Sequence, residues 1–426
     1  MSEPTSQLTM LSLCNKVAKE AGIAYYGPAG TSPAMLPIDK DTLSRVKDCV
    51  NDGINMFVAD APENGWKWRK RIMQIAISNT RVTGTADSAD ATTLVDDAIS
   101  TVYDTNDELN GWYIYISSGT GEGSFAQITD YVASSGTITV SDWLDENGNP
   151  GGIDPAASSG YIITPYETVK GDASRYYLPE DFGGDIIGNI TYTKDTSHDE
   201  KVDWVSESEI RALSQNGDDS GYPYKAAIRP IEPVSGLNPK RRYELLLYPT
   251  PAQDDILEFP YAVVFNKLDI ESGLVTSVNA GIYTLYDNTR SETDNYFNGY
   301  KLSIIDGPGK GESAIISDYA SSTGSFIFTA GTWFTIAPTT SSVYIVEPVN
   351  NLHPAGIKFD HVVKSACLAQ MELDFSNTAM GRIEAYIQKD LQKAYQADAR
   401  SFSHITPSKK VRRLRTWNPV EFLGEL

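Results

Sequence analysis

Few residues in this sequence have the types and spacing that a catalytic or metal-binding site requires. The chain has four histidines, at positions 198, 353, 361 and 404. They follow no metal-ligand spacing, no serine lies in the Gly-x-Ser-x-Gly pattern of hydrolases, and the three cysteines form no Cys-x-x-Cys pair. Two carboxylates could act together on a polysaccharide, but the order of the 56 acidic residues does not show which would meet. We therefore predict no catalytic residue, no cofactor and no metal site.

Two glycine-rich segments and one acidic loop resemble ligand-binding loops. Residues 119–123 (Gly-Thr-Gly-Glu-Gly) and 307–311 (Gly-Pro-Gly-Lys-Gly) have glycines at alternate positions, as some phosphate-binding loops do. A phosphate-binding loop opens a helix, whereas a strand pattern follows both segments, so we predict hairpin turns. Residues 145–154 have oxygen-bearing side chains at approximately calcium-loop spacing. They lack the glutamate at the twelfth position and the flanking helices, which favours a solvated loop.

Tryptophans and basic residues alternate near position 70. The segment contains Trp66, Trp68, Arg69 and Arg71, with two lysines between them. Such a mixture can bind nucleic acid by stacking and charge. The interpretation that we favour is that the tryptophans fill the junction between N-terminal helices and a sheet, and that the cations meet an acidic surface of the same or a neighbouring subunit. These four residues are our candidates for subunit packing.

A second basic segment lies at the end of the sequence. Its candidate docking residues are Lys409, Lys410, Val411, Arg412, Arg413, Leu414, Arg415 and Trp417. Residues 409–426 carry five basic and two acidic side chains, a net charge of +3, whereas the whole chain carries −21. Apolar residues interleaved with cations favour an arm that orders on a partner's sheet or groove. The alternatives are a disordered end and a DNA contact.

The overall charge and the apolar content restrict the function further. The chain of 426 residues has 35 basic and 56 acidic side chains, so it repels nucleic acid and anionic membranes unless a local basic patch dominates. Its hydrophobic content of 41% argues against a disordered chain. The apolar runs are strand-sized and no export signal is recognisable, so we expect no membrane span and synthesis in a cytoplasm.

The elements that must position these residues fall into six segments. We predict an αα-hairpin and first strand at 1–78, a β-module at 79–165, a central β region at 166–267, a second β-module at 268–348, C-terminal helices at 349–406 and the basic arm at 407–426. In the last two helices, Leu373 and Ile387 are among the residues expected to face inward. The predicted fold class is α+β, with helical N- and C-terminal elements packed against a central antiparallel β domain.

The two β-modules, module 1 (79–165) and module 2 (268–348), are copies of one unit. Residues 110–123 align with residues 298–311 at an offset of 188, and the alignment continues without a gap to Ser141 and Thr329. Each copy is expected to form a small all-β barrel or sandwich. An inserted module needs adjacent ends, so the simplest scheme is one parent domain with two homologous modules in two of its loops.

The order of the motifs outside the modules resembles the head-to-tail adaptors of tailed bacteriophages, the group that includes tubular tail protein A. In chain order, the motifs that carry the resemblance are 64–68 (Asn-Gly-Trp-Lys-Trp), 176–182 (Tyr-Tyr-Leu-Pro-Glu-Asp-Phe), 223–228, 243–251, 257–264 and 395–400. The modules in turn resemble β-modules that recur in phage virion proteins.

The resemblance implies a structural, non-enzymatic virion protein at the head-tail junction. It implies a ring, usually of twelve copies, that joins the portal protein to the tail and forms part of the DNA exit channel. The basic arm would dock into the portal, the opposite β side would receive a downstream tail or nozzle protein, and the modules would face outward, in reach of fibres. An acidic channel lets DNA pass without specific binding.

Two alternatives come from other classes of protein. One is a receptor- or glycan-binding virion or tail protein that uses the two β-modules, with Trp112, Tyr113 and Tyr115 exposed on module 1. The other is an enzyme that acts on polysaccharide, which would require a pair of carboxylates.

Overall fold

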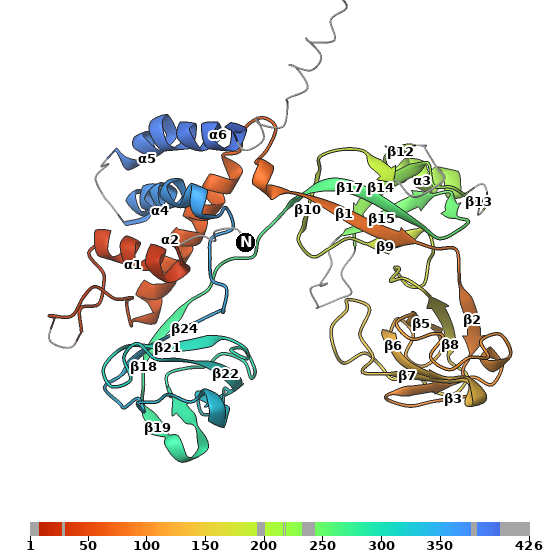
Figure 1. The fold of residues 1–426 in the computed structure, drawn as a ribbon, viewed down its shortest axis with the longest axis horizontal. Coiled ribbons are helices and arrows are strands. Elements are labelled where there is room, and N and C mark those ends of the chain that lie inside the picture. The colour runs from red at the N-terminus through yellow and green to blue at the C-terminus, as the bar shows by residue number, and fades with distance from the viewer. Residues whose placement is uncertain are drawn as a thin grey trace, which may run out of the picture. The chain divides into compact units, whose positions relative to one another are not determined.

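The computed structural model of the chain describes residues 8–27, 30–193, 201–215, 217, 219–231, 243–375 and 381–400. The protein has an α+β fold in which helices from both ends of the sequence combine with several β-sheets (Figure 1). Two of the sheets belong to the β-modules, so the predicted fold class, with its two all-β insertions, is confirmed.

The chain divides into two compact units, whereas the sequence suggested one parent domain. The helical unit comprises residues 1–68 and 265–426, and the sheet unit comprises residues 69–264. The expectation of one domain is wrong because the helices bury their apolar faces against one another, while the central sheet has a core of its own. Each unit carries one of the two β-modules.

Helices from both ends of the sequence build the core of the helical unit. They are α1 (Met10–Glu20), α2 (Lys40–Ala59), α4 (Asp360–Phe375), α5 (Arg382–Ala385), the π-helical turn η7 (Tyr386–Asp390) and α6 (Leu391–Arg400). The side chains of Thr9 and Asp39 cap α1 and α2 by accepting hydrogen bonds from backbone N–H groups. Gly53 allows α2 to approach α4 closely, because a Cβ at this position would lie 2.5 Å from Cα of Cys367.

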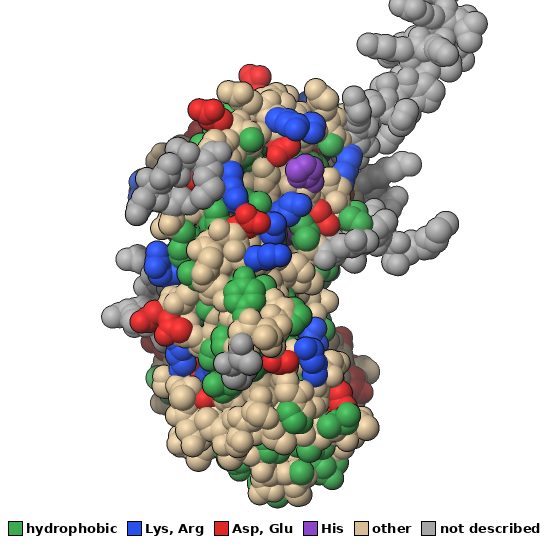
Figure 2. Space-filling view, turned by 90° about the vertical axis from the view of Figure 1, so that its left-hand side faces the viewer, with side chains coloured by type: hydrophobic (Ala, Val, Ile, Leu, Met, Phe, Trp, Pro, Cys, Tyr) green, Lys and Arg blue, Asp and Glu red, His purple; other side chains and the backbone are tan. Residues whose placement is uncertain are grey.

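Two apolar residues that were expected to face inward lie on the surface of this unit instead. Leu373 is 59% exposed and Ile387 is 50% exposed. Ile387 belongs to η7, and a π-turn contains about one more residue than an α-turn, which rotates the following side chains. At Leu373 the inward positions of the last turn of α4 are taken by Met371 and Glu372, which are buried. On the face drawn in Figure 2, basic and acidic side chains are interspersed with apolar ones.

The sheet unit is built on an eight-stranded central sheet. Its strands are β1 (Lys70–Ile77), β9 (Arg175–Tyr177), β10 (Phe182–Ile186), β11 (Ile190–Tyr192), β12 (Lys201–Trp204), β14 (Lys225–Pro230), β15 (Tyr243–Tyr248) and β17 (Asp255–Val263). They are ordered β1-β17-β11-β12-β14-β15-β9, with β10 also paired to β17. The pairs are antiparallel except β12 with β14, which are parallel and are connected through α3 (Glu207–Ser214). A separate pair is formed by β13 (Ser220–Gly221) and β16 (Thr250–Pro251).

The two modules have the same strand order. Module 1 contains β2 (Val82–Thr85), β3 (Ser88–Ala89), β4 (Thr93–Val95), β5 (Tyr113–Ser118), β6 (Phe125–Val132), β7 (Thr137–Val140) and β8 (Gly160–Thr164). Module 2 contains β18 (Glu271–Leu274), β19 (Ser277–Asn279), β20 (Thr284–Tyr286), β21 (Lys301–Asp306), β22 (Ser313–Ala320), β23 (Ser325–Phe328) and β24 (Val343–Glu347). The order is β2-β8-β5-β6-β7-β4-β3 in one and β18-β24-β21-β22-β23-β20-β19 in the other.

Each module is a closed barrel because its first segment pairs at both ends of the sheet. In module 1, residues 82–85 pair with β8 and residues 88–89 pair with β4, and backbone hydrogen bonds at Ala86 and Asp87 continue both pairings. In module 2, β18 and β19 pair with β24 and β20 in the same way. The first and last strands of each module are neighbours, which is the geometry that an insertion in a loop requires.

Candidate functional site

The two glycine-rich segments are hairpin turns, as predicted. Residues 119–123 connect β5 to β6, and residues 307–311 connect β21 to β22. The alternate glycines of both turns have positive φ, a backbone conformation that glycine adopts without strain. In the acidic loop, the Asp145 carboxylate accepts hydrogen bonds of 2.8 Å from the backbone N–H groups of Asn147 and Asn149. This carboxylate therefore stabilises its own turn.

Trp66 is buried inside the helical unit and is 1% exposed. Its indole Nε1 lies 3.2 Å from the carbonyl oxygens of Phe57 and Val58, at the end of α2. Its ring centroid is 4.7 Å from that of Phe57 and 5.6 Å from that of Tyr395 on α6. Because the ring packs within its own chain, the prediction that Trp66 contacts a neighbouring subunit is corrected.

The other three residues of this cluster do not form one surface with Trp66. Trp68 also belongs to the helical unit, is partly buried, and stacks on Phe265 with 5.6 Å between ring centroids. Arg69 and Arg71 belong to the sheet unit. Arg69 donates to the carbonyl oxygen of Val263 at 3.0 Å, and the exposed Arg71 lies 3.4 Å from the Asp181 carboxylate. Both cations therefore contact groups of their own unit, and subunit packing by Trp68, Arg69 and Arg71 stays a prediction.

The predicted docking arm, Lys409 to Trp417, lies outside the described residues. Of the three aromatic residues expected to be exposed on module 1, Tyr115 is 4% exposed, so this expectation is wrong for Tyr115. Its hydroxyl accepts a hydrogen bond of 2.8 Å from the backbone N–H of Thr168. Trp112 and Tyr113 are partly buried.

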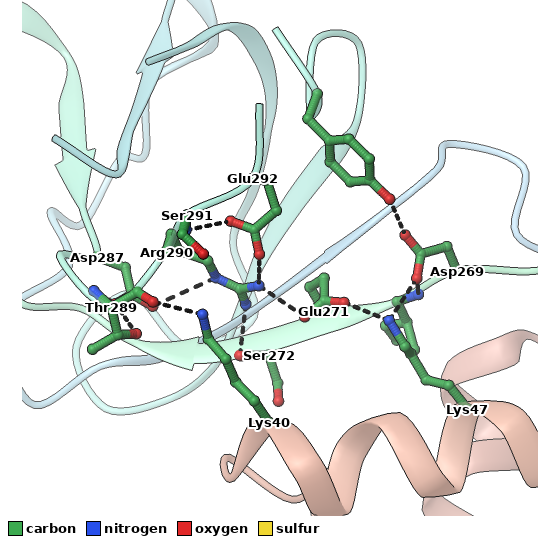
Figure 3. A network of polar contacts seen from close by, with 12 residues as sticks. Lys40, Lys47, Asp269, Glu271, Ser272, Asp287, Thr289, Arg290, Ser291 and Glu292 are labelled. Atoms are coloured by element: carbon green, nitrogen blue, oxygen red, sulfur yellow. Dashed lines mark hydrogen bonds and ion pairs between the residues drawn. The ribbon is translucent and has the colours of Figure 1, made fainter. Parts of the chain in front are cut away.

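A polar network joins module 2 to helix α2 in the helical unit (Figure 3). The Lys47 ammonium donates to the Asp269 carboxylate at 2.9 Å and to the Glu271 carboxylate. At the start of the same helix, the Lys40 ammonium donates to the backbone carbonyl oxygen of Thr289 at 2.5 Å. Helix α2 thus contacts both the first strand of the module and a loop on its surface.

Arg290 is the centre of this network, and its side chain is fully buried. Its Nη1 donates to Glu271 at 2.7 Å and to Glu292 at 2.9 Å. Its Nη2 donates to the carbonyl oxygen of Ser272 at 2.7 Å, and its Nε donates to the Tyr344 hydroxyl at 3.0 Å. Glu271 receives both Arg290 and Lys47, so one carboxylate connects the interior of the module to α2.

Burial and charge act in opposite directions on the pKa of both cations. Burial lowers the pKa of Arg290, but Tyr344 and Glu271 together raise it by more than burial lowers it, so the pKa lies above its ordinary value. The pKa of Lys47 is raised for the same reason, because its two carboxylate partners outweigh burial. Burial raises the pKa of Tyr344 well above its ordinary value. The neutral phenol therefore donates to Asp287, at 2.5 Å, and accepts from Arg290.

Module 1 contains the same buried tyrosine and aspartate but not the arginine. The Tyr161 hydroxyl donates to Asp96 at 2.6 Å, as Tyr344 does to Asp287. In both modules, the backbone N–H three residues after the aspartate donates to the aspartate's carbonyl oxygen. This third residue is Ile99 in module 1, where it belongs to the apolar core and is 3% exposed.

Sequence reasoning missed this network because its members lie far apart in the chain. Lys47 and Glu271 are separated by 224 positions. The signal that could have found Arg290 is the comparison of the two modules, since Asp-Asp-Ala-Ile at 96–99 corresponds to Asp-Asn-Thr-Arg at 287–290. A charged residue in place of a core isoleucine indicates that the two modules are attached by different chemistry.

The described part of the chain contains no group of three or more His, Cys, Asp or Glu residues that could hold a metal ion. Within the same residues, no helix combines the length and the apolar character that a membrane crossing needs. The comparisons with protein-family models, curated proteins and solved structures gave no match to this chain.

Proposed function

We propose that this protein is a structural component of a phage virion, an adaptor ring that joins the portal to the tail and forms part of the DNA exit channel. The order of motifs around the two modules supports this proposal. In one of these motifs, the segment Leu-Pro-Glu-Asp-Phe, Leu178 and Phe182 are buried in the core of the central sheet. Asp181 of the same segment accepts a hydrogen bond from the Tyr261 hydroxyl at 3.0 Å.

The observation that carries the ring is the exposed apolar surface of the C-terminal helices. Leu373 on α4 and Ile387 on η7 are each at least half exposed. Closed rings use heterologous interfaces, in which one face of a subunit packs against a different face of the next. These two side chains, in place of Trp66, are our candidates for the packing of one copy against its neighbour. Charge steers such contacts, and the chain's net charge of −21 keeps the DNA path free of specific phosphate contacts.

The test is the native mass of the purified chain, alone and mixed with the portal ring encoded in the same genome. The proposal expects a closed complex with many copies per portal ring. A chain that stays monomeric and does not bind the portal would refute it.

Matched variants localise the contact within the ring. Leu373→Lys and Ile387→Lys should abolish the ring while leaving the unfolding temperature unchanged, because both side chains are exposed. Val102→Lys is the control, since Val102 is 70% exposed on module 1. Rings that form normally with both lysine variants would rule out this surface.

A further inference from the structure

Two adjoining cavities lie between module 1 and the central sheet, inside the sheet unit. Their volumes are about 280 Å³ and about 500 Å³, and they share Glu146, Asn147, Tyr177 and Ile231 as lining residues. Ligand sites in proteins are typically concave spaces of roughly 300–1,000 Å³ with a few convergent polar groups. The two ends of this space present different chemistry.

The larger cavity has an arginine pair held by one buried glutamate. Glu244 on β15 lies opposite Arg229 on β14 and opposite Tyr177 on β9, so alternation along the strands places these side chains on one face of the sheet. Arg175 lies on β9, two residues before Tyr177, and therefore on the same face. The Glu244 side chain is 2% exposed. It accepts hydrogen bonds of 2.8–3.2 Å from Nε and Nη2 of Arg175, and it accepts another from Nε of Arg229.

These contacts leave one guanidinium nitrogen of each arginine for a ligand. Nη1 of Arg229 lies 3.4 Å from Glu207. Among the described residues, neither Nη1 of Arg175 nor Nη2 of Arg229 makes a hydrogen bond within the chain. The two arginines and the carboxylates of Glu244 and Glu207 carry no net charge together, and the Lys170–Glu146 ion pair at 2.9 Å beside them is neutral as well. Planar guanidinium groups that are fixed in this way match the geometry of a carboxylate or a phosphate.

The smaller cavity has a different character. Phe125 and Leu144 supply an apolar wall, while Gln127, Asn147 and Glu180 supply amide and carboxylate oxygens. Amide and carboxylate oxygens accept hydrogen bonds from hydroxyl groups. A flat apolar wall beside such acceptors suits a molecule with one apolar face and many hydroxyl groups, which is the character of a sugar ring.

Module 2 lacks this surface. At the offset of 188, the positions of Tyr113, Phe125 and Gln127 in module 1 correspond to lysine, serine and isoleucine at positions 301, 313 and 315. The aromatic and amide lining thus belongs to module 1 alone, although the two barrels share one strand order. Phe125 and Tyr113 belong to a small apolar cluster on the outside of this barrel, and module 2 keeps the strand order without them.

We propose that this space binds an anionic saccharide, with its carboxylate or phosphate at Arg175 and Arg229 and its ring on the Phe125 side. The sugar hydroxyls donate to the oxygens of the smaller cavity. This inference goes beyond the adaptor function and does not depend on it, because the site lies within one chain and its test does not involve ring formation.

The test is isothermal titration calorimetry on the full chain. Digalacturonate is the carboxylated probe, galactose 6-phosphate is the phosphorylated probe, galactobiose is the neutral sugar and acetate is the anion alone. We expect at least one of the two anionic sugars to bind, and galactobiose and acetate each to bind at least about tenfold more weakly, the loss of about one charge-assisted hydrogen bond. No binding of either anionic sugar up to about 10 mM, or equal binding of acetate, would overturn the proposal.

Three variants assign the binding to this cavity. Arg229→Gln should weaken binding at least about tenfold. Lys225→Gln is the matched control, because Lys225 lies on the same strand and has an ion pair with Glu209 but does not line the cavity. Gln127→Ile introduces the residue of module 2 at an exposed position, and it should weaken binding even if Arg229→Gln fails to fold. Unchanged affinity in Gln127→Ile and in a folded Arg229→Gln would overturn the assignment.

Discussion

Replacing Arg290 by isoleucine tests whether the polar network fixes module 2 to the helices. Module 1 has an isoleucine, Ile99, at the equivalent position in its core. The substitution therefore fills the core of module 2 with a side chain that the homologous barrel accommodates. The change should therefore isolate the loss of the charge. Arg290 is fully buried and contacts Glu271 at 2.7 Å and Glu292 at 2.9 Å. Removing one partner of a buried ion pair costs about 3–5 kcal/mol, because the other partner stays buried without its counter-charge. Here Asp287 and Glu292 lose their cation, whereas Glu271 keeps Lys47.

The measurement is the free energy of unfolding of the helical unit, from calorimetry, with hydrogen exchange to identify the unit that melts. For a domain of ~150–250 residues, each kcal/mol lowers the melting temperature by about 2–4 °C, so we expect a decrease of about 6–20 °C. The control is Lys16→Gln, which removes a surface pair with Glu20 and should cost less than about 0.5 kcal/mol. Adding Glu292→Gln to Arg290→Ile should recover part of the loss, because it removes a carboxylate that has lost its cation. A loss for Arg290→Ile below about 1 kcal/mol would refute the reasoning, because that is the range of a surface pair.

Three further predictions concern the folding of the two units. Trp66→Ala should destabilise the helical unit by about 3–5 kcal/mol, the usual cost of removing a large buried aromatic side chain, and thermal unfolding measures it. Gly136→Ala and Gly324→Ala should each unfold or strain their barrel, because a Cβ would lie 1.9 Å and 2.1 Å, respectively, from a backbone carbonyl oxygen. The control is Gly331→Ala, since a Cβ at this position meets open space. Equal melting temperatures for the three variants would contradict this prediction. Burial raises the pKa of Glu292, but hydrogen bonds and Arg290 lower it below its ordinary value of 4.5, so its stabilising contribution is present above pH 4.5 and is lost as the pH falls further. Unfolding free energies between pH 7 and pH 2 should therefore decline less steeply for Glu292→Gln than for the unmodified chain.

The helices and hairpins could be predicted from the sequence because their signals are local. The cap at Asp39 and the apolar stripe of α2 lie within one short segment, and so do the alternate glycines of each hairpin turn. The exposure of Ile387 was not predictable in this way, since the π-turn changes the phase of the pattern without a recognisable residue. Trp66 was ambiguous for a related reason, because the same local pattern fits a buried junction and an exposed contact.

The division into two units and the candidate site depend on contacts between distant segments. A periodic pattern shows that a helix has an apolar face, but it does not show which other element covers that face. The pairing of Lys47 with Glu271, and the cavity between module 1 and the sheet, arise only when such segments meet. The sequence does contain one indirect signal of such contacts, the differences between the two modules. Residues that both copies share are those that the barrel requires, so a difference such as Arg290 in place of Ile99 points to a contact outside the barrel.

Because its first and last strands pair with each other, each barrel begins and ends at nearly the same point of its parent unit. Val82 and Ile163 are register partners in neighbouring strands, and adjacent strands lie about 4.8 Å apart. Because the two ends of the module lie so close together, the module takes the place of a short turn in the rest of the sheet unit. The loop-closure entropy of the parent sheet therefore does not grow with the number of residues in the module. Such a barrel can be gained, lost or exchanged without altering the strand register of the parent sheet. The side chains on its outer face can meanwhile diverge, which gives the barrel a new attachment or a new ligand.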